Sequence, residues 1–196
     1  TFEVIDGGRT KNPSVKDIAD AIERAPTPDV VVLPNDSNVV PAARQAADLS
    51  GKNVGIVPTV SIQQGVAAAL ALNTEADLDT NIGAMTSAVA AVRSGEVTIA
   101  SRDVTLGGIT TVTGEFIGIL DGTLVASGPG LSAVLDGVIE ESGAGDDDLI
   151  TLFRGEPVAE SEADEEMARL ADRFDGAEFE LVDGGQPHYH YLLSFE

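Results

Sequence analysis

The residues best suited to metal chemistry are His188 and His190, which flank Tyr189 and are the only histidines of the chain. A His-x-His pair on a strand places both rings on one face, where they can ligate a metal ion. Catalytic zinc sites use three protein ligands, and no third ligand is evident near the pair except Asp183. The pair is therefore more typical of surface or interface histidines on a terminal strand, and we expect no metal site.

Two clusters of side-chain oxygens have the residue types that bind a divalent cation. Residues 146–148 are three consecutive aspartates, and residues 35–38 read Asn-Asp-Ser-Asn. The second cluster lacks the later glycine and the glutamate at position twelve that a calcium loop requires. We interpret the first as a solvated loop before a strand, and the second as a strand-end turn that leads into a helix.

Sequence signatures of catalysis are missing. The chain contains neither a Walker phosphate loop nor a dinucleotide-binding fingerprint, and it has no Gly-x-Ser-x-Gly elbow. It has no cysteine, so a thiolate nucleophile and zinc–sulfur sites are excluded. We expect no catalytic residue within these 196 residues, and an independent metal-dependent enzyme is the least supported alternative.

The charge of the chain excludes two kinds of partner. The formal net charge is −22, and residues 136–196 hold 18 acidic against 3 basic residues. A chain without a basic stripe is unsuited to nucleic acid and to anionic membrane surfaces. Its 43% hydrophobic residues allow a full core, yet no apolar run is long enough to span a membrane. We expect a cytoplasmic protein that meets another protein or a small molecule, with the acidic side chains as a solvating coat.

The order of apolar segments predicts an α/β protein with two lobes. In the N-terminal lobe, residues 1–76, strand patterns at 2–5, 30–33 and 53–57 alternate with helical patterns from Ser14, at 39–49 and at 61–72, which predicts a parallel sheet with flanking helices. Residues 77–94 read as a long connecting helix. Residues 95–196 predict a mixed α+β lobe, with antiparallel strands to about residue 127, helices at 131–141 and from 161, and strands at 149–153, 179–182 and 191–195.

One segment of the first lobe echoes the second. Residues 2–8 and residues 179–185 both read as a strand that runs into Asp-Gly-Gly. If the match is more than chance, each lobe ends a strand with the same loop. The chain starts inside this strand-like run at Thr1, so we expect it to be a piece of a longer protein.

Polar loops follow the three predicted strands of the first lobe. Parallel sheets bind ligands at the carboxyl ends of their strands, so these loops should share one edge. They carry almost no charge, which suits a hydrogen-bonded protein interface or a small polar head group; ordinary turn and capping chemistry is the alternative. The residues expected to bind there are Arg9, Thr10, Asn35, Asn38, Thr59, Ser61 and Gln64.

Four ordered motifs, which span nearly the whole chain, resemble one bacterial family. Residues 7–14, 33–38, 57–65 and 184–189 are similar to the C-terminal region of the ATP-binding, dihydroxyacetone-kinase-like subunit of fatty acid kinase, a relative of the DegV fold. The resemblance adds Asn12, Gln186, His188 and Tyr189 to the candidate binding residues. The family pattern differs from this chain at Arg9, Lys11, Gln63 and His190, so no specific contact is carried over at those positions.

The resemblance also implies a function. The parent protein is then an ATP-dependent kinase, with ATP and magnesium in a preceding N-terminal domain and no cofactor in this region. Its partners are a DegV-type fatty-acid-binding carrier protein and the other domains of the same kinase, with a homodimer left open. This region docks the carrier so that an acyl phosphate is formed. The alternative is a DegV-like module that itself binds a fatty acid or similar lipid.

Overall fold

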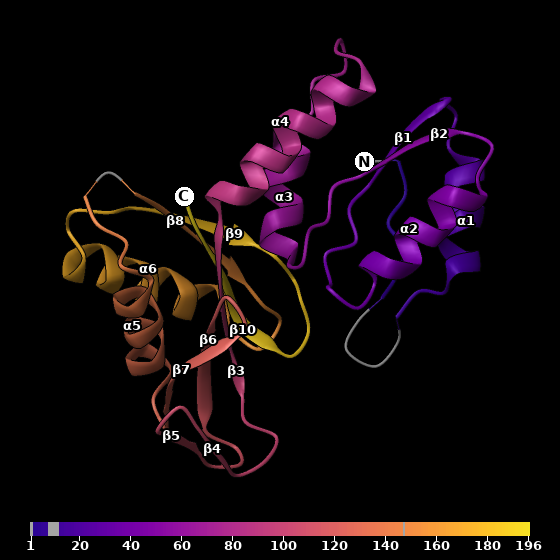
Figure 1. Cartoon of the computed structure of the whole chain (residues 1–196). Helices are drawn as coiled ribbons and strands as arrows, with labels where there is room; N and C mark the ends of the chain where they lie inside the picture. The colour runs from indigo at the N-terminus through magenta and orange to yellow at the C-terminus, as the bar shows by residue number, and fades with distance from the viewer. Residues whose placement is uncertain (1, 8–11, 147) are drawn as a thin grey trace. The chain divides into compact units, whose positions relative to one another are not determined.

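The computed structural model describes residues 2–7, 12–146 and 148–196. The chain divides into two compact units, Thr1–Val92 and Arg93–Glu196, whose helices and strands are labelled in Figure 1. Arg9 and Thr10, two of the predicted binding residues, lie outside the described residues, as does Asp147 of the aspartate run.

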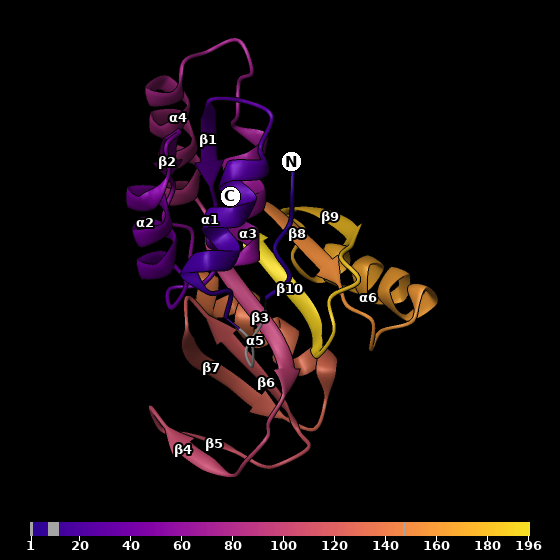
Figure 2. The same ribbon diagram turned by 90° about the vertical axis from the view of Figure 1, so that its right-hand side faces the viewer.

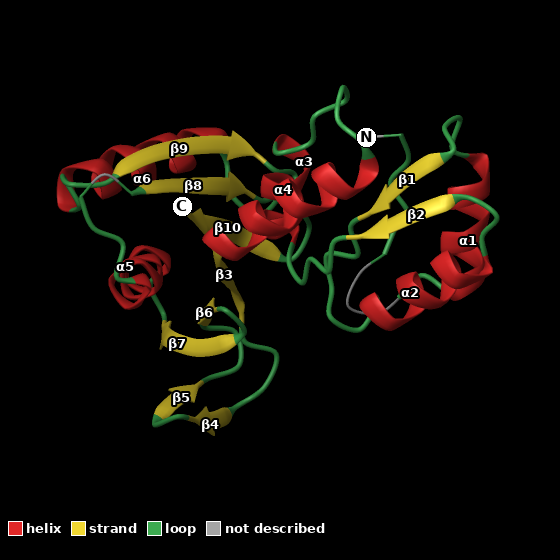
Figure 3. Ribbon diagram, turned by 45° about the horizontal axis from the view of Figure 1, so that its top comes forward, coloured by secondary structure: helices red, strands yellow, loops and turns green. Residues whose placement is uncertain are grey.

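Unit 1 is a three-layer α/β arrangement around a two-stranded parallel sheet. Strands β1 (Asp29–Val32) and β2 (Asn53–Ile56) pair in parallel. Helices α1 (Val15–Arg24) and α2 (Val40–Leu49) share one apolar cluster with Val30, Val32, Val54 and Ile56. Helices α3 (Ile62–Leu70) and α4 (Leu78–Ala91) share another cluster with Val31, Leu33 and Val57. Because successive strand residues point to opposite faces, the sheet is covered on both sides (Figure 3).

The start of α1 follows the prediction from the sequence. The Ser14 hydroxyl accepts a hydrogen bond from the backbone N–H of Asp17 at 3.2 Å, and the Asp17 carboxylate accepts one from the backbone N–H of Ser14 at 2.9 Å. These reciprocal bonds form a capping box, which satisfies two backbone donors at the helix start.

Two expectations for unit 1 need correction. The helix expected to connect two lobes belongs to unit 1, because Met85 of α4 packs with Val57 and Ala68 in the core of that unit. Residues 2–7 form no regular strand: Val4 is 82% exposed, and only Ile5 packs on the cluster beneath α1 and α2. The echo with residues 179–185 is therefore one of sequence alone, since only the second copy lies on a strand.

Unit 2 is built on a six-stranded sheet in the order β7-β6-β3-β10-β8-β9, whose strands can be followed in Figure 2. The strands are β3 (Arg93–Ile99), β6 (Phe116–Leu120), β7 (Thr123–Gly128), β8 (Leu149–Arg154), β9 (Glu178–Asp183) and β10 (Tyr189–Phe195). A small hairpin of β4 (Val104–Leu106) and β5 (Ile109–Thr111) forms a separate two-stranded sheet, and β5 contacts β7. Only the β8–β9 pair of the large sheet is parallel, and helix α6 connects its two strands.

The core of unit 2 lies between this sheet and two helices, α5 (Leu131–Ser142) and α6 (Glu160–Arg173). Val138 and Ile139 of α5 and Leu170 of α6 are buried against Leu152 and Leu193 of the sheet. The sequence predicted this mixed α+β architecture, and the structure confirms it. Within the described residues, no helix is both long and apolar enough to cross a bilayer.

Candidate functional site

The loops after β1 and β2, two of the three predicted to share an edge, meet as the parallel pairing predicts. The backbone N–H of Asn35, after β1, donates to the Thr59 hydroxyl at 3.0 Å, and that hydroxyl donates to the Asn35 side-chain oxygen at 2.8 Å. Thr59, after β2, is fully buried. Two of the predicted binding residues therefore lie side by side at the carboxyl edge of the sheet and are hydrogen-bonded to each other.

Helix α3 closes this loop pair from the side. Asn35 has a positive φ of 57°, a conformation that asparagine adopts more readily than most residues. Its side chain lies against Gly65 of α3, where an added Cβ would stand 2.2 Å from the Asn35 side-chain oxygen. A glycine is thus required at this point of α3 for the loop and the helix to approach each other.

Two further predicted residues, Ser61 and Gln64, organise the start of α3. The Ser61 hydroxyl accepts a hydrogen bond from the backbone N–H of Gln64 at 3.1 Å. The Gln64 side-chain oxygen accepts one from the backbone N–H of Val60 at 2.9 Å. These bonds are the helix-capping chemistry named as the alternative to binding, and they fix the backbone from residue 60 to residue 64.

Asn12 and Asn38 are two predicted binding residues on the exposed surface of unit 1. Both are exposed, and the backbone N–H of Asn38 donates to the Asp36 carboxylate at 2.7 Å in a turn before α2. The structure does not bring them into the Asn35–Thr59 pair. Their role as binding residues stays a prediction.

An exposed apolar surface next to the loops was missed by the sequence analysis. Ile62, Val66 and Leu70 stand four residues apart on α3 and are 47%, 38% and 81% exposed; we call these three residues the α3 stripe. Val60, in the loop before the helix, is also exposed. Residues four apart lie on one face of a helix. The signal in the sequence is that residues 53–74 carry no charged side chain at all, in a chain that is 22% charged.

The predicted residues of unit 2 lie in the turn between β9 and β10. The Gln186 side-chain amide donates to the backbone carbonyl of Phe153 at 2.7 Å, and the Thr98 hydroxyl donates to the backbone carbonyl of His188 at 2.7 Å. Tyr189 is the first residue of β10, and its carbonyl lies where a Cβ on Gly155 would be. These contacts hold the turn against β8 and β3.

His190, one of the two histidines expected at a surface or an interface, is half-buried on β10. The register of β10 against β3 shifts, so that Tyr189 is opposite Thr98 and Tyr191 is opposite Val97. His190 is the extra residue of this bulge; its ring makes an edge contact with Phe116 at 5.0 Å between centroids. Among the described residues, no three His, Cys, Asp or Glu side chains are arranged to hold a metal ion.

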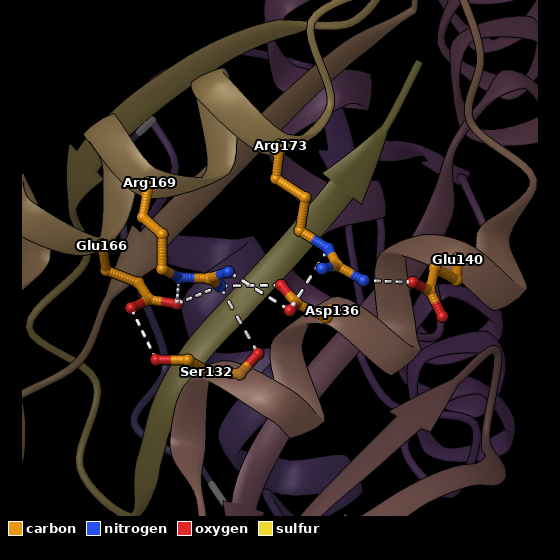
Figure 4. A network of polar contacts seen from close by, with 6 residues as sticks. All are labelled: Ser132, Asp136, Glu140, Glu166, Arg169 and Arg173. Atoms are coloured by element: carbon orange, nitrogen blue, oxygen red, sulfur yellow. Dashed lines mark hydrogen bonds and ion pairs between the residues drawn. The ribbon is translucent and has the colours of Figure 1, made fainter.

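A charge network joins the two helices of unit 2 (Figure 4). The Arg169 guanidinium bonds the Asp136 carboxylate at 2.7 and 3.2 Å and the Glu166 carboxylate at 2.6 and 3.1 Å. The Ser132 hydroxyl donates to the other Glu166 oxygen at 2.8 Å, and Arg173 pairs with Asp136 at 3.3 Å. The Arg169 guanidinium is thus paired with two carboxylates.

The sequence of the chain matches a known protein family. The model of the FakA-like C-terminal family, the C-terminal region of one type of fatty acid kinase subunit, matches residues 1–196. Protein YloV of Bacillus subtilis is 36% identical over 193 residues, which are 98% of this chain and 35% of that protein. Protein SH1689 of Staphylococcus haemolyticus is 33% identical over the same shares. The chain therefore spans about a third of the length of these curated relatives.

Solved structures with the same fold are DegV-like. A DegV-family protein of Corynebacterium glutamicum has a TM-score of 0.67 at 16% identity, covering 98% of this chain and 87% of that one. A Thermotoga maritima protein with fatty acid binding function has a TM-score of 0.66 at 14% identity, covering 94% and 76%. The fatty acid kinase B3 protein of Streptococcus pneumoniae, loaded with linoleic acid, has a TM-score of 0.59 at 12% identity, covering 94% and 76%.

Proposed function

Because the chain belongs to the FakA-like C-terminal family of fatty acid kinases, we propose that it is the docking region of a cytoplasmic fatty acid kinase subunit. Its partner is a DegV-type fatty-acid carrier protein. In this proposal, ATP-dependent phosphorylation of the fatty acid carboxylate takes place on a part of the longer protein outside this chain. ATP and magnesium bind there, and this chain holds the carrier in place.

The observation that carries the proposal is the α3 stripe together with Val60. Single exposed apolar side chains are common on protein surfaces, but these four lie within residues 53–74, where no charge interrupts them. Helical residues at positions i, i+4 and i+8 form the ridge that docks in an apolar groove of a partner. The surface therefore suits a protein better than a small polar molecule.

The charge distribution supports the same choice. With a net charge of −22, the chain repels other acidic proteins over most of its surface, and like charges facing each other across an interface oppose association. The α3 stripe offers a face free of that repulsion. The loops next to the stripe are held by hydrogen bonds between their own polar groups, from Asn35, Thr59, Ser61 and Gln64. These bonds fix the shape of the face.

Matched substitutions of exposed leucines test the docking surface. Leu70→Asp places a charge on the α3 stripe, whereas Leu49→Asp places the same charge on α2, where Leu49 is 69% exposed. We expect Leu70→Asp to weaken binding to the carrier encoded by the same genome at least about tenfold, as loss of a buried apolar contact does, with Leu49→Asp near wild type. Surface plasmon resonance with immobilised carrier measures both, and circular dichroism checks the fold. Equal affinities for the two variants contradict the assignment of the surface.

A second candidate function rests on the fold. Structures with this fold include proteins that bind fatty acids, which supports the alternative of a DegV-like module that holds an acyl chain itself. Native mass spectrometry of the purified chain distinguishes the two functions. A co-purified acyl chain at stoichiometric amounts favours the lipid-binding module, while a bare chain that gains one carrier molecule favours docking; a dimer of the chain shows as a separate species.

A further inference from the structure

Unit 2 contains a cavity of about 610 Å³ that the proposed function does not use. Strands β6 and β10 contribute Phe116, His190 and Tyr191 to its lining. Leu131 of α5 and Val158 before α6 supply apolar surface, and α6 contributes the charged side chains. The cavity therefore has an apolar aromatic wall on one side and a polar helix on the other.

Two buried polar atoms on the cavity wall have no hydrogen-bond partner within the described part of the chain. They are the hydroxyl of Tyr191, a residue with none of its surface exposed, and Nδ1 of His190. Most buried polar side-chain atoms in folded proteins are hydrogen-bonded. Consecutive residues of a regular strand face opposite sides of the sheet. The bulge at His190 breaks that rule, and both side chains line the same cavity.

The side chains that line the cavity carry a net negative charge. Glu162, Glu165 and Glu166 of α6 all line it, and among the described lining residues Arg169 is the one cationic side chain. The charge of Arg169 is already offset by Glu166 and Asp136. The exposed Glu162 and Glu165 therefore give the cavity a net negative charge. Burial, with smaller contributions from Glu166 and Glu162, raises the pKa of the Tyr191 hydroxyl to about 12. Burial lowers the pKa of His190, so both rings face the cavity uncharged.

We propose that this cavity binds an organic cation, a guanidinium or primary ammonium group on a short alkyl chain. The cationic group lies between Glu165 and the Tyr191 hydroxyl, which accepts a hydrogen bond from it, as does Nδ1 of His190. The alkyl part packs on Leu131 and Val158, and the Phe116 and Tyr191 rings add cation–π attraction. A carboxylate is repelled here, and a bare metal ion lacks a set of three ligands among the described residues.

Nuclear magnetic resonance of the full chain tests the proposal, since 2 tyrosines and 2 histidines give few ring signals to assign. Three probes are titrated: agmatine as a free amine, N-acetyl-arginine amide as a stand-in for a protein side chain, and butyrate as the anionic control. We expect saturable shifts of the Tyr191 and His190 ring signals with a cationic probe and none with butyrate. Stronger binding of agmatine indicates a free amine, and comparable binding of the arginine amide indicates a side chain of a partner protein.

Two variants and a matched control separate binding from general charge. Tyr191→Phe and Glu165→Gln should each weaken the cationic probe by about three- to tenfold, as loss of a hydrogen bond to a charged group does. Glu141→Gln removes the same charge from an exposed position on α5, away from the cavity lining, and should leave the affinity unchanged. Shifts with butyrate that equal those with the cations, no saturation with either cation, or equal losses in Glu141→Gln and Glu165→Gln would overturn the proposal. None of these outcomes depends on carrier docking.

Discussion

Asn35, Thr59 and Gly65 show how single residues build the edge of unit 1. Asn35 adopts a positive φ, Thr59 supplies the hydroxyl that bonds Asn35, and Gly65 leaves the space for the Asn35 side chain. The meeting of Asn35 and Thr59 could be predicted, because parallel neighbours end at the same edge. The part of Gly65 could not, since a glycine in a helix is explained only once its neighbour in space is known.

The space at Gly65 gives the first prediction. Gly65→Ala places a Cβ 2.2 Å from the Asn35 side-chain oxygen, and forcing atoms into a packed site destabilises by about 1–3 kcal/mol. That loss outweighs the gain of up to about 1 kcal/mol from alanine in a helix. We expect the free energy of unfolding to fall by about 1–2 kcal/mol in urea denaturation.

Gly83→Ala is the control for Gly65→Ala. Gly83 lies inside α4 and is exposed, and within the described residues no atom outside the local helix backbone lies within 4 Å of its ideal Cβ. Only the helix-propensity gain applies there, so we expect stabilisation by about 0.5–1 kcal/mol. If both alanine variants were stabilised alike, the close approach of α3 and Asn35 would be disproved.

The Tyr191 hydroxyl gives a prediction at alkaline pH. Its pKa is raised from 10.0 to about 12, chiefly by burial, so the folded chain keeps this proton in a range where the unfolded chain releases it. The resulting stabilisation is complete below pH 10 and is lost as the pH rises toward 12. We expect a tyrosinate absorbance component with a midpoint near 12 that disappears in Tyr191→Phe and persists in Tyr189→Phe. Persistence of the component in Tyr191→Phe would rule out this assignment.

At the scale of elements, the sequence predicted most helices and strands but not all of their exposed faces. Helices α1, α2, α5 and α6 stand where the periodicity placed them. The α3 stripe was missed because an alanine-rich helix offers apolar residues on several faces, so its buried face is not marked. The cavity of unit 2 was missed because strict strand alternation places His190 and Tyr191 on opposite faces of the sheet. The bulge brings both side chains to the same cavity, and no sequence pattern predicts that bulge.

The network between α5 and α6 gives a prediction at this scale. Asp136 pairs with both Arg169 and Arg173, and its side chain is only 15% exposed. Asp136→Asn leaves two guanidinium groups short of a carboxylate, so we expect a loss of about 1–2 kcal/mol in the free energy of unfolding. Glu140→Gln removes the same charge from the more exposed pair with Arg173 and should change stability by less than about 1 kcal/mol. Equal effects in urea denaturation would show that partial burial adds nothing to this network.

At the scale of the whole molecule, the acidic residues are concentrated in unit 2, whereas the α3 stripe lies in an uncharged segment of unit 1. Residues 136–196, all in unit 2, hold 18 of the 33 acidic residues, whereas residues 53–74 of unit 1 hold none. A net charge of −22 is unsuited to nucleic acid and to anionic membrane surfaces. Together with the exposed α3 stripe, this distribution favours unit 1 as the face that we propose for the carrier.

The central claim is that this chain docks a DegV-type carrier, and calorimetric titration of the wild-type chain with the carrier of the same genome tests it most directly. We predict a saturable heat with a one-to-one stoichiometry, in the absence of ATP, and a negative heat-capacity change because apolar surface is buried. No heat at high micromolar concentrations of both proteins, at more than one temperature, would contradict the docking function.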